Sequence, residues 1–185
     1  DGNLLWQKTW GRFDVNEWAI ATNVDTANNL YASGWATNPE TNDLDIFLLK
    51  INPSGDLIWQ RTWGGASRDA GFHVETDPTG NIYISGITAS TGAGSQDVIL
   101  LEINSSGTLL SQVTWGSAGN DGPHVSMTLD ESGTFFVTGE VHDPPYTLGT
   151  PDFKLKSPDI ELLDSSIELG FPSIDLYTPN GSIGT

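Results

Sequence analysis

The sequence contains no cysteine and few cations, and both shortages exclude classes of function. Without cysteine there is neither a disulfide framework nor a thiolate metal site. Seven lysines and arginines stand against 24 aspartates and glutamates, which gives a net charge of −17. Because this surplus repels phosphates and anionic lipid surfaces, we expect no nucleic-acid partner.

Long apolar runs and catalytic motifs are missing as well. No run approaches the roughly 18 apolar residues of a membrane span, so we expect no membrane insertion. The Gly-x-Ser-x-Gly, Walker and His-Glu-x-x-His patterns are not present, and we therefore predict that the chain is not an enzyme. The chain begins at Asp1 without methionine or signal sequence, so we expect a processed chain or a piece of a longer one.

What the sequence does contain is a unit of about 50 residues that recurs. Three segments match closely, GNLLWQKTWG (2–11), GDLIWQRTWG (55–64) and GTLLSQVTWG (107–116). Their Trp-Gly pairs are 53 and then 52 residues apart. A fixed period of this length, rich in short strands, is typical of propellers and other stacked arrays.

Each unit holds four segments that alternate like half-buried strands and are joined by turns. The 21 glycines suit such turns, and Asn28 or Asn29 can adopt the positive φ for which the turn at 77–81 has Gly80. We predict an all-β fold of four-stranded antiparallel β-propeller blades, with about three repeats of 52–53 residues. The predicted strands of the first two units are 3–10, 18–24, 30–34, 45–51, 57–63, 71–76, 81–86, 97–103 and 108–115.

The chain divides into the repeats at 1–140 and an irregular insertion with the end of the third unit at 141–185. We place the blade units at 11–63, 64–116 and 117–140 onward. The third unit departs from the pattern where Val141 to Tyr146 becomes too rich in proline for a central strand.

The third strand of the third unit has two alternative positions. Residues 152–155 and 159–163 both resemble the strand that begins Asp45-Ile46-Phe47. Farther along, 177–183 resembles the strand end and turn at 51–57. On that match the step from Gly107 to Gly181 is 74 residues, 22 more than the 52 before it, and the excess is an insertion within the third unit.

The repeated residues resemble a known family. Trp-Gly-Gly, Asp-Ala, Asp-Pro-Thr-Gly-Asn-Ile-Tyr-Ile-Ser-Gly and Asp-Val-Ile-Leu-Leu-Glu-Ile-Asn-Ser-Ser-Gly, all between 63 and 107, are similar to the bacterial and archaeal beta-propeller repeat of the SBBP type. The resemblance covers about 1–140. It implies a secreted or cell-surface propeller, often part of a larger modular protein, without common catalytic residues.

Two sets of residues recur at one position of each unit and are candidate binding residues. Trp10, Trp63 and Trp115 could form a platform for sugar rings, although recurrence favours packing between neighbouring sheets. Six residues after each tryptophan stands an oxygen-bearing side chain, and these could ring one mouth of a channel, with Asp69 and Asp121 as ligands of Ca²⁺. The alternative is that each caps a turn. The three residues are Asn16, Asp69 and Asp121.

Two classes of function fit the sequence. The first, which we favour, is a non-catalytic extracellular or cell-surface scaffold or binding module with a protein or glycan ligand. The second is a quinoprotein-type enzyme, because 52–59 faintly resembles segments that dock pyrroloquinoline quinone. The missing cysteine pair and the short chain argue against it.

The number of units predicts assembly. Closed propellers usually have 4 to 8 blades, whereas this chain supplies two regular units and one irregular unit. We therefore expect 1–10 to complete a blade, either the third blade of the same chain or that of a partner, through self-association or another chain segment.

Overall fold

The computed structural model describes residues 2–12, 15–122, 125–130, 134–138, 155–156, 176–177 and 183–184. In these ranges the regular structure is entirely β, and every strand pair is antiparallel. The predicted all-β class with four-stranded antiparallel sheets is therefore confirmed. Within the same ranges, no helix has the length and hydrophobicity needed to span a bilayer.

Two sheets of four strands form the body of the molecule, and each runs in simple sequence order. Sheet 1 contains β1 (Glu17–Val24), β2 (Leu30–Thr37), β3 (Leu44–Ile51) and β4 (Leu57–Trp63). Sheet 2 contains β5 (Asp69–Thr76), β6 (Ile82–Thr88), β7 (Asp97–Ile103) and β8 (Leu109–Trp115).

The two sheets share their irregularities as well as their order. Each first strand shifts register at one bulge, between Ala19 and Ala21 in β1 and between Gly71 and His73 in β5. The turn after β1 places Asn28 at a φ of 61°, where the turn after β5 has Gly80 at 91°. The prediction that asparagine adopts positive φ in this turn is thus confirmed.

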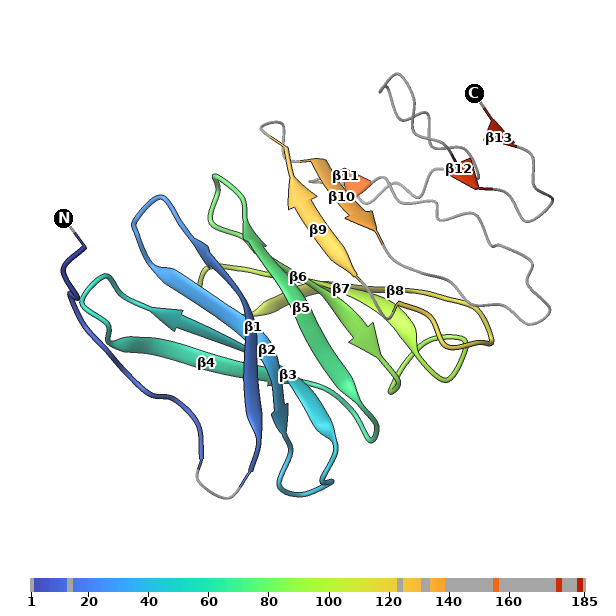
Figure 1. The fold of residues 1–185 in the computed structure, drawn as a ribbon, viewed down its shortest axis with the longest axis horizontal. Helices are drawn as coiled ribbons and strands as arrows, with labels where there is room; N and C mark the ends of the chain where they lie inside the picture. Colours follow the sequence, from blue (N-terminus) through green and yellow to red (C-terminus); the bar gives the residue numbers. More distant parts are fainter. Residues whose placement is uncertain are drawn as a thin grey trace.

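The sheets pack face to face, with β5 against β1, β2 and β3 (Figure 1). Alternate residues of each strand point to opposite faces, so Ile46 and Leu48 of β3 pack with Ile84 and Leu101 of sheet 2. On the other face of sheet 2, Leu100 packs in a second cluster with residues of the next sheet. β7 is buried on both faces, which explains its almost continuous apolar sequence.

The third sheet contains β9 (Ser126–Leu129), β10 (Thr134–Thr138) and β11 (Leu155–Lys156), in the order β11-β10-β9. Of the two alternatives for the third strand, 152–155 includes Leu155 of β11, which pairs with Phe135 of β10, whereas 159–163 and the rest of 152–155 lie outside the described residues. Leu155 lies opposite Phe135 as Ile103 lies opposite Ile82, which is three positions later in the unit than the similarity to Asp45-Ile46-Phe47 gives.

A separate two-stranded sheet pairs β12 (Leu176–Tyr177) with β13 (Ile183–Gly184). It pairs Tyr177 with Ile183, as sheet 1 pairs Ile51 with Leu57. The predicted similarity of 177–183 to 51–57 therefore extends to the pairing of their ends. The remainder of 141–185, like the predicted turn at 131–133, lies outside the described residues.

Residues 3–10, which we name the N-terminal arm, do not form the predicted strand. The alternating sequence is present, but strand structure also requires a neighbour for the backbone hydrogen bonds. In the part of the chain that the structure describes, no strand pairs with the arm.

Candidate functional site

The N-terminal arm lies across the face of sheet 1 that is turned away from sheet 2. The indole N–H of Trp6 donates to the carbonyl oxygen of Pro53 at 3.1 Å. The indole N–H of Trp10 donates to Oε1 of Gln60 at 2.7 Å, and its ring lies 4.5 Å from that of Phe47 between centroids. The arm is thus held by two tryptophans.

These contacts repeat, one unit later, between sheet 1 and sheet 2. The indole N–H of Trp59 in β4 donates to the carbonyl oxygen of Ser105 at 3.3 Å. Gly107 lies against the Trp59 ring as Gly55 lies against the Trp6 ring, because a Cβ on these glycines would come within 3.3 Å and 2.8 Å of a ring carbon. The arm therefore contacts sheet 1 as β4 contacts sheet 2.

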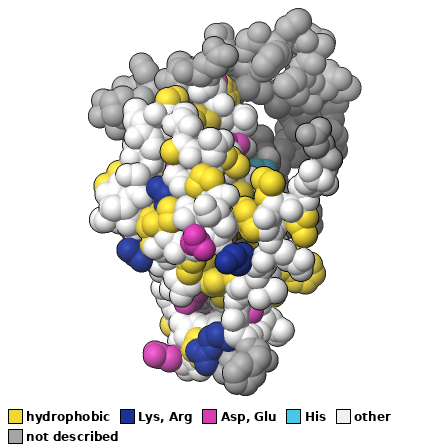
Figure 2. Space-filling model, turned by 90° about the vertical axis from the view of Figure 1, so that its left-hand side faces the viewer, with side chains coloured by type: hydrophobic (Ala, Val, Ile, Leu, Met, Phe, Trp, Pro, Cys, Tyr) yellow, Lys and Arg dark blue, Asp and Glu magenta, His cyan; other side chains and the backbone are white. Residues whose placement is uncertain are grey.

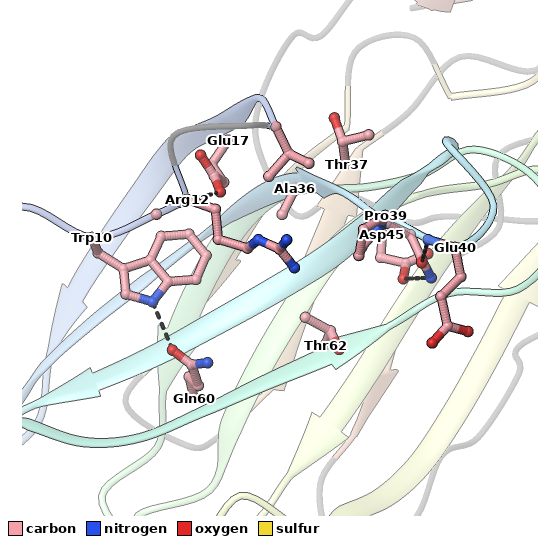
Figure 3. Close-up of a pocket in the computed structure, with 13 residues that line it drawn as sticks. Trp10, Arg12, Glu17, Ala36, Thr37, Pro39, Glu40, Asp45, Gln60 and Thr62 are labelled. Atoms are coloured by element: carbon pink, nitrogen blue, oxygen red, sulfur yellow. Dashed lines mark hydrogen bonds between the residues drawn. The ribbon is translucent and has the colours of Figure 1, made fainter.

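A cavity of about 540 Å³ lies between the arm, the loop after it and sheet 1 (Figure 3). Trp10 forms an aromatic side of the cavity and is 37% exposed. Its other walls combine apolar, charged and amide side chains, among them Ala36, Arg12, Glu17, Glu40, Asn38 and Gln60. Such a mixed lining suits a ligand with both apolar and hydrogen-bonding groups.

Asp45 lies at the inner end of this cavity, at the start of β3 (Figure 3). Its Oδ2 accepts a hydrogen bond from Nδ2 of Asn38 at 2.8 Å, whereas its Oδ1 is buried without a hydrogen-bond partner. Burial raises the pKa of Asp45, and the negative charges of Asp69 and Asp43 raise it further against the hydrogen bond from Asn38.

The predicted aspartates lie inside the molecule, each beside a second aspartate. Asp69 accepts the backbone N–H of Gly65 at 2.9 Å, and Asp121 accepts the backbone N–H of Ser117. A Cβ on Gly64 would collide with Asp45 and lie 3.0 Å from Oδ2 of Asp69. Asp97 and Asp121 surround Gly116 in the same way. Asp69 and Asp121 therefore each cap a turn, which is the alternative role that the sequence offers for them.

Asn16 differs from the other two predicted oxygen ligands. Its backbone carbonyl accepts the N–H of Thr37 at 2.8 Å. The neighbouring Glu17 caps the turn instead, since its Oε1 accepts the backbone N–H of Arg12 at 2.8 Å. Among the described residues, no three or more acidic, histidine or cysteine side chains form a metal-binding group. The assignment of Ca²⁺ to Asp69 and Asp121 stays a prediction.

The other predicted tryptophans pack between sheets. Trp63 is half-buried against the cluster between sheets 1 and 2, and Trp115 packs against the cluster on the far face of sheet 2. Trp63 also lines a smaller cavity of about 120 Å³, together with Ile46, Asp69 and Gln112. Of the six predicted site residues, only Trp10 lines the 540 Å³ cavity.

Asp45 and Gln60 line the cavity but were not among the predicted site residues, although the sequence carries a signal for both. Asp45 precedes Asp69 by 24 residues, and Asp97 precedes Asp121 by 24. A glutamine stands three residues before each repeated tryptophan, as Gln60 does before Trp63. Glu17 carries no such signal, because its counterpart in the next unit is an alanine.

Comparison with models of known protein families finds no match to this chain, and comparison with curated proteins finds none either.

Proposed function

We propose that the chain is a non-catalytic propeller scaffold of a cell surface or extracellular medium, and that it binds an extended protein segment beside the N-terminal arm. The stacking of sheets 1 and 2 through β5 supports a blade arrangement (Figure 1). The acidic composition and the lack of cysteine and of catalytic motifs support an extracellular, non-enzymatic role.

One observation carries the proposal: the 540 Å³ cavity is an enlarged counterpart of the 120 Å³ cavity between sheets 1 and 2. Trp10 corresponds to Trp63 in the smaller cavity, and Gln60 corresponds to Gln112. The smaller cavity is also lined by Ile46 of β3. In the described part of the chain, no strand next to the arm supplies a residue equivalent to Ile46, so the larger cavity has room for one.

The arm offers the backbone groups that such a segment needs. β4, its counterpart in sheet 1, pairs with β3 along most of its length. Unpaired strand edges accept additional strands, whose main-chain hydrogen bonds give affinity while alternate side chains fill pockets. We therefore propose that the bound segment resembles β3 and β7, which have aspartate as their second and first residue and continue with apolar residues.

A peptide experiment tests this function. A fluorescently labelled peptide with the sequence of residues 97–104, DVILLEIN, should bind the intact chain with saturable fluorescence anisotropy. A scrambled peptide should bind much more weakly. Trp10→Ala should weaken binding at least tenfold, because it removes a wall of the cavity and the hydrogen bond to Gln60.

Leu110→Ala is the matched control, since Leu110 lies exposed on β8, away from the arm. It should leave the affinity unchanged. Equal affinity for the scrambled peptide, or binding to a glycan array that Trp10→Ala abolishes while the peptide does not bind, would contradict the proposal.

A further inference from the structure

We infer that the partner is a second copy of this chain, whose sheet β9-β10-β11 takes the N-terminal arm as its fourth, outer strand. The inference rests on the proposed function, because it names the protein segment that binds beside the arm. Among the described residues it unites two incomplete elements: the N-terminal arm, which no strand pairs with, and a sheet of three strands without a fourth.

The third sheet has the order of the first three strands of sheets 1 and 2. In those sheets a fourth strand pairs with the third. Among the described residues, the outer edge of β11 pairs with no strand, and β13 pairs with β12 instead. The third sheet therefore presents the edge on which β4 and β8 lie in the complete sheets.

The register of the repeat aligns the arm with β11. Ile51 lies opposite Leu57 in sheet 1, and Ile103 lies opposite Leu109 in sheet 2. Leu155 occupies the position of Ile103, and Leu4 precedes Leu57 by the 53 residues of the first period. The same pairing would place Leu155 opposite Leu4.

The arm cannot make this pairing within its own copy while it contacts sheet 1. The sheets succeed one another, with β5 packed on sheet 1 and β9 packed on β5 (Figure 1). Face-to-face sheets lie about 10 Å apart, so sheet 2 separates the arm from β11 by roughly 20 Å or more. A partner therefore has to supply the three-stranded sheet.

The open face of sheet 1 has an apolar side chain for such a partner. Val24 of β1 is 53% exposed, whereas Val74 of β5, which packs against sheet 1, is 3% exposed. Figure 2 shows hydrophobic side chains over this end of the molecule, interspersed with a few charged ones. A stacked sheet from the partner would cover Val24 as sheet 1 covers Val74.

The blade number determines the size of the assembly. In the described part of the chain, sheet 1, sheet 2 and a completed third sheet give three blades for each copy. Two copies joined head to tail at both ends give six, which lies within the 4 to 8 blades of closed propellers. In such a closed ring every arm pairs with a third sheet, so that no copy keeps an unpaired arm or an incomplete third sheet.

Single cysteines test this pairing, because the natural chain has none that would interfere. Leu4→Cys and Leu155→Cys variants are purified separately, mixed under mild oxidation and separated without reductant. Directly opposed residues of antiparallel strands bring their Cβ atoms near disulfide distance. The mixture should yield a covalent pair that contains one of each variant.

The matched control replaces Leu5, whose side chain is 88% exposed, next to Leu4 at 78%. Because adjacent side chains of a strand point to opposite faces, Leu5→Cys should cross-link with Leu155→Cys at least tenfold more slowly. Circular dichroism of each variant confirms that it folds before mixing. If Leu155→Cys does not fold, a displacement measurement replaces the cross-linking test. Unlabelled chain should displace the bound 97–104 peptide as the chain concentration rises. Thr134→Cys with Lys156→Cys, which pair within one copy, then serves as the positive control for disulfide formation.

Equal cross-linking from Leu4 and Leu5, or a disulfide that forms only when Leu4→Cys and Leu155→Cys are in the same chain, would overturn the inference. Failure of displacement would overturn it as well. If the 97–104 peptide still binds in these cases, the proposed function stands and only the identity of the partner is wrong.

Discussion

At the scale of single residues, the turns after the second and third Trp-Gly pairs are each built from two aspartates and a glycine. Gly64 lies against Asp45 and Asp69, and a side chain in its place would collide with the Asp45 carboxylate. Asp69 is satisfied by the backbone N–H of Gly65 and the hydroxyl of Ser90, at 2.9 and 2.7 Å. Asp45 has only the amide of Asn38, and its second oxygen is buried without a partner.

This difference predicts a pH-dependent stability. Because the pKa of Asp45 is raised in the folded protein, folding takes up a proton there, and the stabilisation is lost as pH rises through the folded pKa. Asp45→Asn should therefore raise the melting temperature at pH 7 by roughly 2 to 4 °C, as about 1 kcal/mol does in a chain of this size. It should change the melting temperature much less at pH 4.

Melting curves followed by circular dichroism between pH 4 and pH 7 check this prediction. Asp56→Asn provides the control, since Asp56 lies exposed after a turn and its ion pair with Lys8, at 3.7 Å, is exposed as well and should contribute little. A lower melting temperature for Asp45→Asn at pH 7 than for the natural chain would contradict the assignment of an unfavourable charge at Asp45.

At the scale of elements, the sequence allowed the eight strands of sheets 1 and 2 to be predicted, because alternation and turn chemistry are local. Asn28 and Gly80 determine their turns through their own φ angles. The arm has the same alternation but forms no strand, since a ladder requires a neighbour that local sequence does not specify.

The candidate site was less predictable for a related reason. Trp10 could be identified from its repeat, but Asp45 and Gln60 line the cavity only because the arm crosses sheet 1. Glu17 replaces the turn-capping aspartate from one position later in the chain, which no periodic pattern predicts. Contacts between elements therefore determine the site, and the repeat determines only the elements.

Burial on both faces predicts that the third strands contribute most to stability. Leu48 of β3 is fully buried in the cluster between the sheets. Leu48→Ala should lower the free energy of unfolding by about 2 to 5 kcal/mol, because it removes buried methyl groups and leaves a cavity. Leu110→Ala on β8, where the side chain is 51% exposed, should change it by no more than about 0.5 kcal/mol.

Urea unfolding followed by tryptophan fluorescence measures both changes. Similar losses for Leu48→Ala and Leu110→Ala would mean that sheets 1 and 2 do not stack as described, since stacking alone makes the two leucines different.

At the scale of the whole molecule, the order of the sheets determines association more than any single contact does. One end of the stack carries the N-terminal arm, held by Trp6 and Trp10, and the other end carries a three-stranded sheet. The net charge of −17 on each copy opposes association. Because salt screens this repulsion, association should be stronger at physiological ionic strength than at low ionic strength.

The mass of the particle in solution tests most directly the central claim that the N-terminal arm completes a sheet of another copy. Light scattering after gel filtration, at physiological ionic strength, compares the intact chain with a variant that lacks residues 1–10. We predict twice the chain mass of 19.9 kDa for the intact protein, and the mass of a single chain for the variant. An intact protein that elutes as a stable single chain, or a variant that remains a dimer, would contradict the account.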